Sequence, residues 1–257
     1  MTNSILIGVD SSTPSRSALL WGIARAEATK ARLELLHVID GAGLARDSAE
    51  WHSLHEAAVE LLRHELAFAR SVAPSLQIMT NTADGRAEDA LARRSVRHSM
   101  LVVGTHKTGF IYGQTFGSRF LGLAWRALCD VAFIPDQAGS ARRGVVAPAE
   151  SSPTGEAIAR FAAAEAAACA QELTLIASTR GEADRAGALA LEAHHGLRVH
   201  ARVSTLPPAE ALIAASAGAS LLVIGRSRSP RSSTLSRSAN HDVLVNMACP
   251  VVVVCAR

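Results

Sequence analysis

The chain has 257 residues, of which 49% are apolar and only 4% aromatic, and its formal net charge is +3. The apolar share exceeds that of disordered chains and is enough for the core of one large or two small domains. The low aromatic share argues against a base-stacking surface, so nucleic acid is not an expected partner. The mild positive charge permits an anionic ligand without requiring one.

The N-terminal sequence and the cysteines indicate the cellular compartment in which the protein is expected. The chain begins Met-Thr-Asn-Ser and then enters a short apolar run, without the regions of a signal peptide, and no apolar run reaches membrane-spanning length. The cysteines, which are Cys129, Cys169, Cys249 and Cys255, show neither a CxxC pair nor metal-ligand spacing. We therefore expect a cytoplasmic protein with reduced cysteines, no membrane partner and no metal site.

The first half opens with a strand, a helix and a second strand. Ile5–Val9 is a short β-rich run, and the Ser/Thr cluster before Pro14 is typical of a helix start. The following residues repeat at helical spacing until "RLELLHV", at 32–38, which predicts the second strand.

A long helix is then predicted over residues 51–72. Its expected buried stripe is Leu54, Ala58, Leu61, Phe68 and Val72. His52, His55 and His64 lie on the same helix among glutamates, but their spacing is not HExxH. We interpret the histidines as part of a solvated or partner-facing surface.

The first half closes with a helix-strand pair in Glu88–His106 and a last strand in Ala127–Pro135. The same order then recurs in Arg143–Ser178, Ala209–Ser227 and Met247–Cys255, with linker composition in Asp136–Gly144. A repeat of half the chain predicts two similar domains, at 1–137 and 142–257. Because each half alternates strand and helix, each should be an α/β domain, an open parallel sheet with helices on both faces.

Ligands of such sheets bind beyond the carboxyl ends of the strands, here after Val9, Val38 and Val103. The third of these loops, "VVGTHKTGFIYGQTFGSRF", contains four glycines, several hydroxyls, a histidine and a lysine. Glycines let a backbone approach a ligand closely, and hydroxyls and N–H groups before a helix suit phosphates. We interpret this stretch as a phosphate loop; the alternative is a long polar loop.

These residues resemble the universal stress protein family in its tandem two-domain form. Nucleotide-binding members have an Asp at the end of the first strand, here Asp10, and Gly-x2-Gly-x9-Gly-Ser/Thr after the fourth. The present loop gives Gly104, Lys107 and Gly117-Ser118, so lysine replaces the second glycine. That lysine either crowds the loop or neutralises a phosphate.

The resemblance implies two repeated Rossmann-like domains of the adenine nucleotide alpha hydrolase-like class. It also implies ATP, alone or with Mg²⁺, as the ligand of the first domain. The implied nucleotide-binding residues are Gly8, Val9, Asp10, Val38, Val103, Gly104, His106, Lys107, Gly117, Ser118 and Arg119. The function that follows is nucleotide sensing in a stress response, without catalytic residues and with slow hydrolysis at most. A ligand-free interaction protein of the same fold is the alternative. An intrachain pseudo-dimer is expected, with a homodimer left open.

The second half is expected to have lost its nucleotide site. Ala149 is taken to replace Asp10, Ser178 to replace Val38, and Arg237 to replace Gly117. Its loop contains four arginines, at 226, 228, 231 and 237. They are open to three interpretations: a solvated basic loop, a side-chain grip on a phosphate, or a weak nucleic-acid contact.

Overall fold

The computed structural model describes residues 3–105, 122–136, 142–226 and 235–255. These residues form two compact units, one on each side of residues 137–141. Unit 1 is described over 3–105 and 122–136, and unit 2 over 142–226 and 235–255. The predicted boundary between the two domains, at residues 137–142, falls on residues 137–141, which lie outside the described part. Among the described residues, no helix has both the length and the apolar character that a membrane crossing requires.

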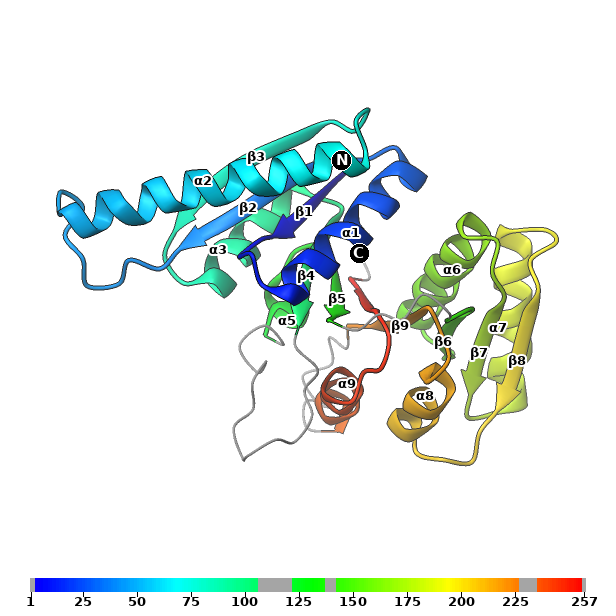
Figure 1. Cartoon of the computed structure of the whole chain (residues 1–257). Coiled ribbons are helices and arrows are strands. Elements are labelled where there is room, and N and C mark those ends of the chain that lie inside the picture. The colour runs from blue at the N-terminus through cyan, green and yellow to red at the C-terminus, as the bar shows by residue number, and fades with distance from the viewer. Residues whose placement is uncertain (1–2, 106–121, 137–141, 227–234, 256–257) are drawn as a thin grey trace. The chain divides into compact units, whose positions relative to one another are not determined.

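Unit 1 is a five-stranded parallel sheet between two layers of helices (Figure 1). Its strands are β1 (Ser4–Gly8), β2 (Arg32–Ile39), β3 (Ile78–Asp84), β4 (Met100–Thr105) and β5 (Asp130–Pro135), in the order β3-β2-β1-β4-β5. Its helices are α1 (Thr13–Thr29), α2 (Ala49–Val72), α3 (Ala87–Arg94), the 3₁₀ turn η1 (Ser95–Arg97) and α5 (Leu123–Arg126). The strand order reverses direction at β1, which has β2 on one side and β4 on the other.

Local sequence explains how α1 begins and which face it covers. The Ser12 side chain accepts a hydrogen bond from the Ser15 N–H, and Pro14 sits in the first turn, where its missing N–H costs nothing. A Cβ on Gly22 would lie 2.5 Å from Ile7, so α1 packs directly on β1. On the other side of the sheet, Leu91 of α3 packs against Gly8.

The long helix α2 is confirmed, but of the five residues of its predicted buried stripe only Ala58 is fully buried. The residues of α2 that are buried are Ala58, Leu62, Glu65 and Ala69. They recur at intervals of four, three and four, which keeps them on one line of a 3.6-residue helix. Two members of the predicted stripe, Leu54 and Val72, are 39% and 45% exposed. The prediction failed beyond Ala58 because the buried line continues through Leu62, Glu65 and Ala69, of which only Leu62 is a large apolar residue.

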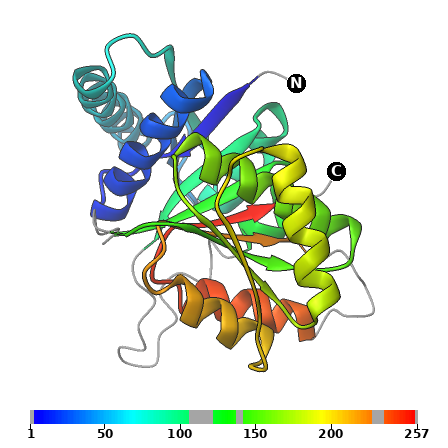
Figure 2. The ribbon, with the colours of Figure 1, turned by 90° about the vertical axis from the view of Figure 1, so that its right-hand side faces the viewer.

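Unit 2 repeats the architecture of unit 1 (Figure 2). Its strands are β6 (Val145–Ala149), β7 (Leu173–Ala177), β8 (Val199–Val203), β9 (Leu221–Gly225) and β10 (Val251–Val254), all parallel, in the order β10-β9-β6-β7-β8. Its helices are α6 (Pro153–Ala168), α7 (Arg180–Ala193), α8 (Pro208–Ser216) and α9 (Leu235–Val245). Helices α8 and α9 lie side by side in Figure 2. The expected α/β class of both halves is confirmed.

The structures of the two units show which residues correspond to one another, and they correct the alignment of Asp10 with Ala149. Helix α6 is capped by Ser152, which accepts from the Gly155 N–H, just as Ser12 caps α1. Counting two residues back from each cap places Glu150, and not Ala149, opposite Asp10. The strand pairing agrees, because Gly8 pairs with Leu36 while Pro148 pairs with Ile176. The acidic position is therefore retained in unit 2 with a longer side chain, and proline replaces Gly8.

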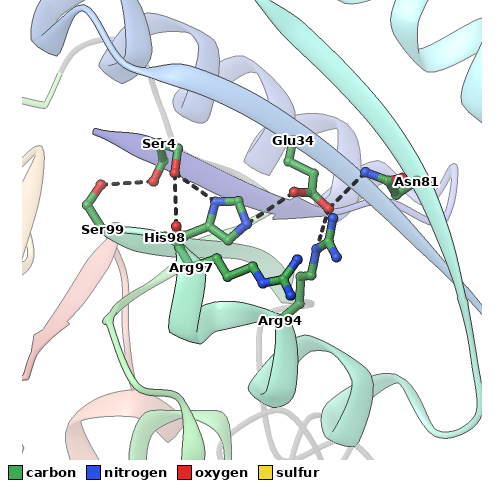
Figure 3. Close-up of polar contacts among 7 residues, drawn as sticks. All are labelled: Ser4, Glu34, Asn81, Arg94, Arg97, His98 and Ser99. Carbon is green, nitrogen blue, oxygen red and sulfur yellow. Dashed lines mark hydrogen bonds and ion pairs between the residues drawn. The ribbon is translucent and has the colours of Figure 1, made fainter. Parts of the chain in front are cut away.

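A buried polar network ties unit 1 together at the amino-terminal end of its sheet (Figure 3). Glu34 of β2 accepts from Arg94 Nε at 2.7 Å and from Asn81 Nδ2 at 3.1 Å, and His98 Nε2 lies 3.2 Å from its other oxygen. His98 Nδ1 is in turn 3.1 Å from the Ser4 hydroxyl of β1. Side chains from β1, β2, β3 and the α3–β4 segment thus meet around one carboxylate.

Candidate functional site

A cavity opens at the carboxyl end of the unit 1 sheet, where the strand order reverses. We call it the strand-end cavity. Its lining residues are Gly8, Val9, Asp10, Ser12, Ser15, Leu36, His37, Val38, Ala87, Leu91, Val103 and Gly104. They come from β1, β2, β4, the first turn of α1, the first two turns of α3, and the segment after β1. This is the location expected for a ligand in an open parallel sheet.

The cavity exists because Gly8 has no side chain. A Cβ on Gly8 would lie 3.3 Å from both terminal methyls of Leu91 and 3.7 Å from Val103. Leu36, Leu91 and Val103 are buried around it, so the inner wall is aliphatic. A larger residue at position 8 would therefore fill the space that a ligand needs.

Gly104 serves a different purpose at the end of β4. A Cβ there would lie 2.2 Å from the carbonyl carbon and oxygen of Pro14 and 2.6 Å from the Ser15 nitrogen. These neighbours are backbone atoms and cannot move aside as a flexible side chain would. Gly104 is thus required for the first turn of α1 to approach β4, which sets one wall of the cavity.

The structure brings together six of the residues predicted for nucleotide binding. Gly8, Val9, Asp10, Val38, Val103 and Gly104 all line the strand-end cavity. The other five, His106, Lys107, Gly117, Ser118 and Arg119, lie outside the described residues. The sequence analysis missed Ser12, Ser15, Leu36, His37, Ala87 and Leu91. A signal for some was present, since Ser12 and Ser15 precede a helix start and His37 is adjacent to the predicted Val38.

The loop between β1 and α1 is held by its own hydrogen bonds. Asp10 N–H donates to the Ser15 hydroxyl at 3.1 Å, and Ser12 N–H donates to Asp10 Oδ1 at 3.0 Å. The Val9 N–H donates to the Leu36 carbonyl at 3.0 Å. These N–H groups are consequently not available as an anion cradle. The loop instead presents the Asp10 carboxylate and two serine hydroxyls, each of which still has its own proton to donate.

The cavity combines aliphatic walls with polar side chains, so it suits a small group that is apolar in part and has polar edges. Its volume of about 80 Å³ is far below the roughly 300–1,000 Å³ of sites that enclose a whole drug-sized ligand. A heterocyclic base is of the right size class, whereas the rest of a nucleotide would extend beyond it. Asp10 and His37 are the titratable side chains of its lining.

An ion pair with a buried carboxylate, between Arg16 and Glu65, lies close enough to Asp10 to feel its charge. Glu65 of α2 is 2% exposed and lies 2.8 Å from Arg16 of α1, whose guanidinium stacks 4.0 Å above the Phe68 ring. Burial raises the pKa of Glu65, Arg16 opposes this effect, and the negative charge of Asp10 adds to it. The pair fixes the first turn of α1 against α2, and it was not predicted because its two residues are 49 positions apart in sequence.

The α2 histidines have local partners. His52 Nδ1 is 2.8 Å from the Ser48 carbonyl, His55 Nε2 is 3.2 Å from Asp84, and His64 Nε2 is 2.7 Å from Glu60. Within the described ranges, no three His, Cys, Asp or Glu side chains are grouped so that they could hold a metal ion. The buried thiol of Cys249 is likewise unreactive in character, since burial raises its pKa to about 11.

The family model and the curated relatives that match this chain belong to the same family. The model of the Universal stress protein family matches residues 1–135. A universal stress protein of Mycobacterium tuberculosis is 28% identical over 166 residues, which is 63% of this chain and 60% of the relative. A second universal stress protein of the same organism is 27% identical over 133 residues, or 51% of this chain and 47% of the relative. The matched region thus spans about half to three fifths of these curated relatives.

Solved structures show the same fold over both units. The crystal structure of a universal stress protein from Archaeoglobus fulgidus matches with a TM-score of 0.81 and 19% identity, covering 100% of both chains. A functionally unknown protein from Pseudomonas aeruginosa PAO1 matches with a TM-score of 0.64 and 17% identity, over 99% of this chain and 93% of that one. At these identities the likeness shows the fold alone.

Proposed function

The chain belongs to the universal stress protein family, and from this premise we propose that it senses ATP, bound in unit 1, as a regulatory protein of a cytoplasmic stress response. The base would occupy the strand-end cavity. The ribose and phosphates would extend toward the residues that follow Gly104. Unit 2 would have a structural or regulatory role.

The observation that supports this proposal most is the space left by Gly8 beneath the Asp10 carboxylate. An aliphatic inner wall of Leu36, Leu91 and Val103 suits the faces of a base, and Asp10 suits its hydrogen-bonding edge. The N–H groups of Asp10 and Ser12 in the β1–α1 loop are used internally. A phosphate would therefore be held elsewhere, and the glycine-rich sequence after β4, with Lys107, Gly117 and Ser118, is the segment suited to it.

Two rivals remain to be separated by experiment. A slow ATPase would use the same site, but among the residues that the structure describes the titratable side chains lining the cavity are Asp10 and His37. That falls short of the groups that phosphoryl transfer employs. A ligand-free interaction protein is favoured by Lys107, which replaces a glycine of the family motif.

Thermal unfolding with ATP tests the proposal. A ligand that binds only the native state stabilises it, by about 2.7 kcal/mol at a hundredfold excess over Kd. We expect ATP to raise the Tm of the wild type and not that of Gly8→Val, whose added carbons would fill the cavity. Gly181→Val is the matched control, because nothing lies within 4 Å of a Cβ at that position. A wild type that ATP fails to stabilise would favour the ligand-free interaction protein, and phosphate release during the assay would reveal an ATPase.

A further inference from the structure

The strand β3 leaves one edge of the unit 1 sheet open. All seven of its residues, Ile78–Asp84, pair with β2 on one side (Figure 1). Among the residues that the structure describes, no strand pairs with β3 on the other side. We call this open side the β3 edge. An open edge is a row of backbone donors and acceptors to which another strand can add.

The hydrogen bonds to β2 determine which backbone groups point outward at the β3 edge. The Gly85 N–H donates to the Ile39 carbonyl of β2 at 3.0 Å. Successive residues of a strand direct their backbone groups to opposite sides, so the odd-numbered residues face β2. The N–H and C=O groups of Thr80 and Thr82 therefore face away from the sheet.

The corresponding edge strand of unit 2, β8, differs from β3 in charge. It contains His200 and Arg202, both exposed, and Glu172 lies 3.2 Å from His200. In contrast, β3 has no charged residue before Asp84, which is its last. Charged side chains are one of the means by which proteins prevent edge strands from pairing. This protection is present in β8 and absent over most of β3.

The two ends of β3 are flanked by opposite charges. At the amino end, Lys30 and Arg32 line a groove of about 600 Å³ together with Ser75, Leu76 and Gln77. Both cations are exposed, and neither has an ion pair within the described part of the chain, while Glu27 is the acidic residue of the same groove. At the carboxyl end, Asp84 is 38% exposed beside His55, and Asp40 is exposed at the end of β2.

We propose that the β3 edge pairs in antiparallel orientation with the β3 edge of a second copy of this chain, and that the two copies form a dimer with a two-fold axis. The register that overlaps the strands fully places Thr80 of one copy opposite Thr82 of the other. These residues then exchange N–H···O bonds, and the threonine side chains form a favourable cross-strand pair.

The flanking charges favour a second copy in this orientation. Antiparallel pairing brings Asp40 and Asp84 of each copy to the end where Lys30 and Arg32 of the other copy lie. A parallel arrangement would instead bring like charges together. Exposed charges of this kind contribute mainly to orientation, and two strands of seven residues form an interface smaller than about 1,200 Å². The dimer should therefore be weak and concentration-dependent.

Sedimentation equilibrium of the full chain over a range of concentrations tests the proposal. Thr82→Lys should weaken the dimer by about tenfold or more, because the two-fold axis places the added charge in both strands. Thr82→Pro is a second disrupting variant, since it removes an outward N–H and leaves the bonds to β2 in place. The matched control is Val203→Lys, at the fifth position of β8 as Thr82 is at the fifth of β3. It should dimerise as the wild type does.

The orientation is tested by exchanging charges. Arg32→Asp should weaken the dimer, and adding Asp84→Arg in the same chain should restore it, because the opposite charges then meet again across the interface. Amide hydrogen exchange gives a second measurement. Exchange at Thr80 and Thr82 should slow as the protein concentration rises, whereas Met79 and Asn81, whose N–H groups bond to β2, should be protected at all concentrations.

Three results would overturn the proposal. The first is a wild type that stays monomeric at every concentration. The second is a dimer that Thr82→Lys and Thr82→Pro both leave intact, or one in which exchange at Thr80 and Thr82 does not slow. The third is a dimer that Val203→Lys weakens as much as Thr82→Lys does. None of these results depends on nucleotide, so they leave the proposed ATP binding to its own test.

Discussion

Glu34 is the residue on which the amino-terminal end of unit 1 depends. Burial by itself would raise the pKa of its carboxyl, but the contacts from His98 and Arg94 outweigh burial and lower the pKa to about 2. Because the folded-state pKa is below the unfolded value of about 4.3, the group stabilises the fold above that pH. The stabilisation is lost as the pH falls toward about 2.

Replacing Glu34 should therefore change both stability and its pH dependence. Glu34→Gln leaves Arg94 and His98 without their counter-charge, so we expect a loss of about 3 kcal/mol at pH 7. The variant should also lose part of the acid destabilisation that the wild type shows between about pH 5 and pH 2. Urea unfolding followed over this pH range measures both effects.

Glu60 of α2 is the control for this experiment. Hydrogen bonds from Arg63 and His64 also lower the pKa of Glu60 to about 2, but its side chain is 54% exposed. Water screens such a pair, so Glu60→Gln should leave the unfolding curves at pH 7 and in acid almost unchanged. If the two variants change the free energy of unfolding equally, burial is not the reason that Glu34 stabilises the protein.

At the scale of elements, α2 shows what periodicity alone can and cannot predict. The helix itself could be predicted, because apolar residues recur at helical spacing over residues 51–72. Most of its buried line could not be predicted in this way, since Glu65 is charged and Ala69 is small. Glu65 is tolerated inside because Arg16 neutralises it, and that partner is 49 residues away in sequence. Long-range charge pairing of this kind leaves no local pattern.

The residues that α2 buries can be checked by comparing the stability losses caused by replacing two of its leucines. Leu62 is 5% exposed and Leu54 is 39% exposed. Leu62→Ala should destabilise the protein by about 2–4 kcal/mol, because it removes buried methyl groups and leaves a cavity. Leu54→Ala should cost well under half of this amount. Chemical denaturation of the two variants measures the difference, and a larger loss for Leu54→Ala would support the stripe predicted from the sequence.

The α/β class and the strand-end location of the site were predictable because both follow from the alternation of elements. The predicted cavity residues Gly8, Asp10 and Val38 lie at strand ends for the same reason. His37 and Leu91 were missed because a residue that faces the cavity cannot be told by sequence from one that faces the core. The alignment of Asp10 with Ala149 was wrong by one residue, and only the shared helix caps, Ser12 and Ser152, set the register.

At the scale of the whole molecule, the two units have the same fold but different cavity residues. Unit 1 has Gly8, which leaves space against Leu91, and Asp10 at the strand end. In unit 2 the corresponding residues are Pro148, whose ring needs the space that glycine leaves, and Glu150, whose side chain is longer by one methylene. We therefore expect one nucleotide per chain, bound in unit 1, although an acidic residue is present in both units.

The most direct test of this account is the stoichiometry of ATP binding measured by titration calorimetry. The wild type should bind close to one ATP per chain. Asp10→Ala should weaken binding by about tenfold to a hundredfold, as expected for a lost charge-assisted hydrogen bond, and Glu150→Ala should leave it unchanged. Two equivalent sites per chain, or binding that depends on Glu150 and not on Asp10, would contradict the account.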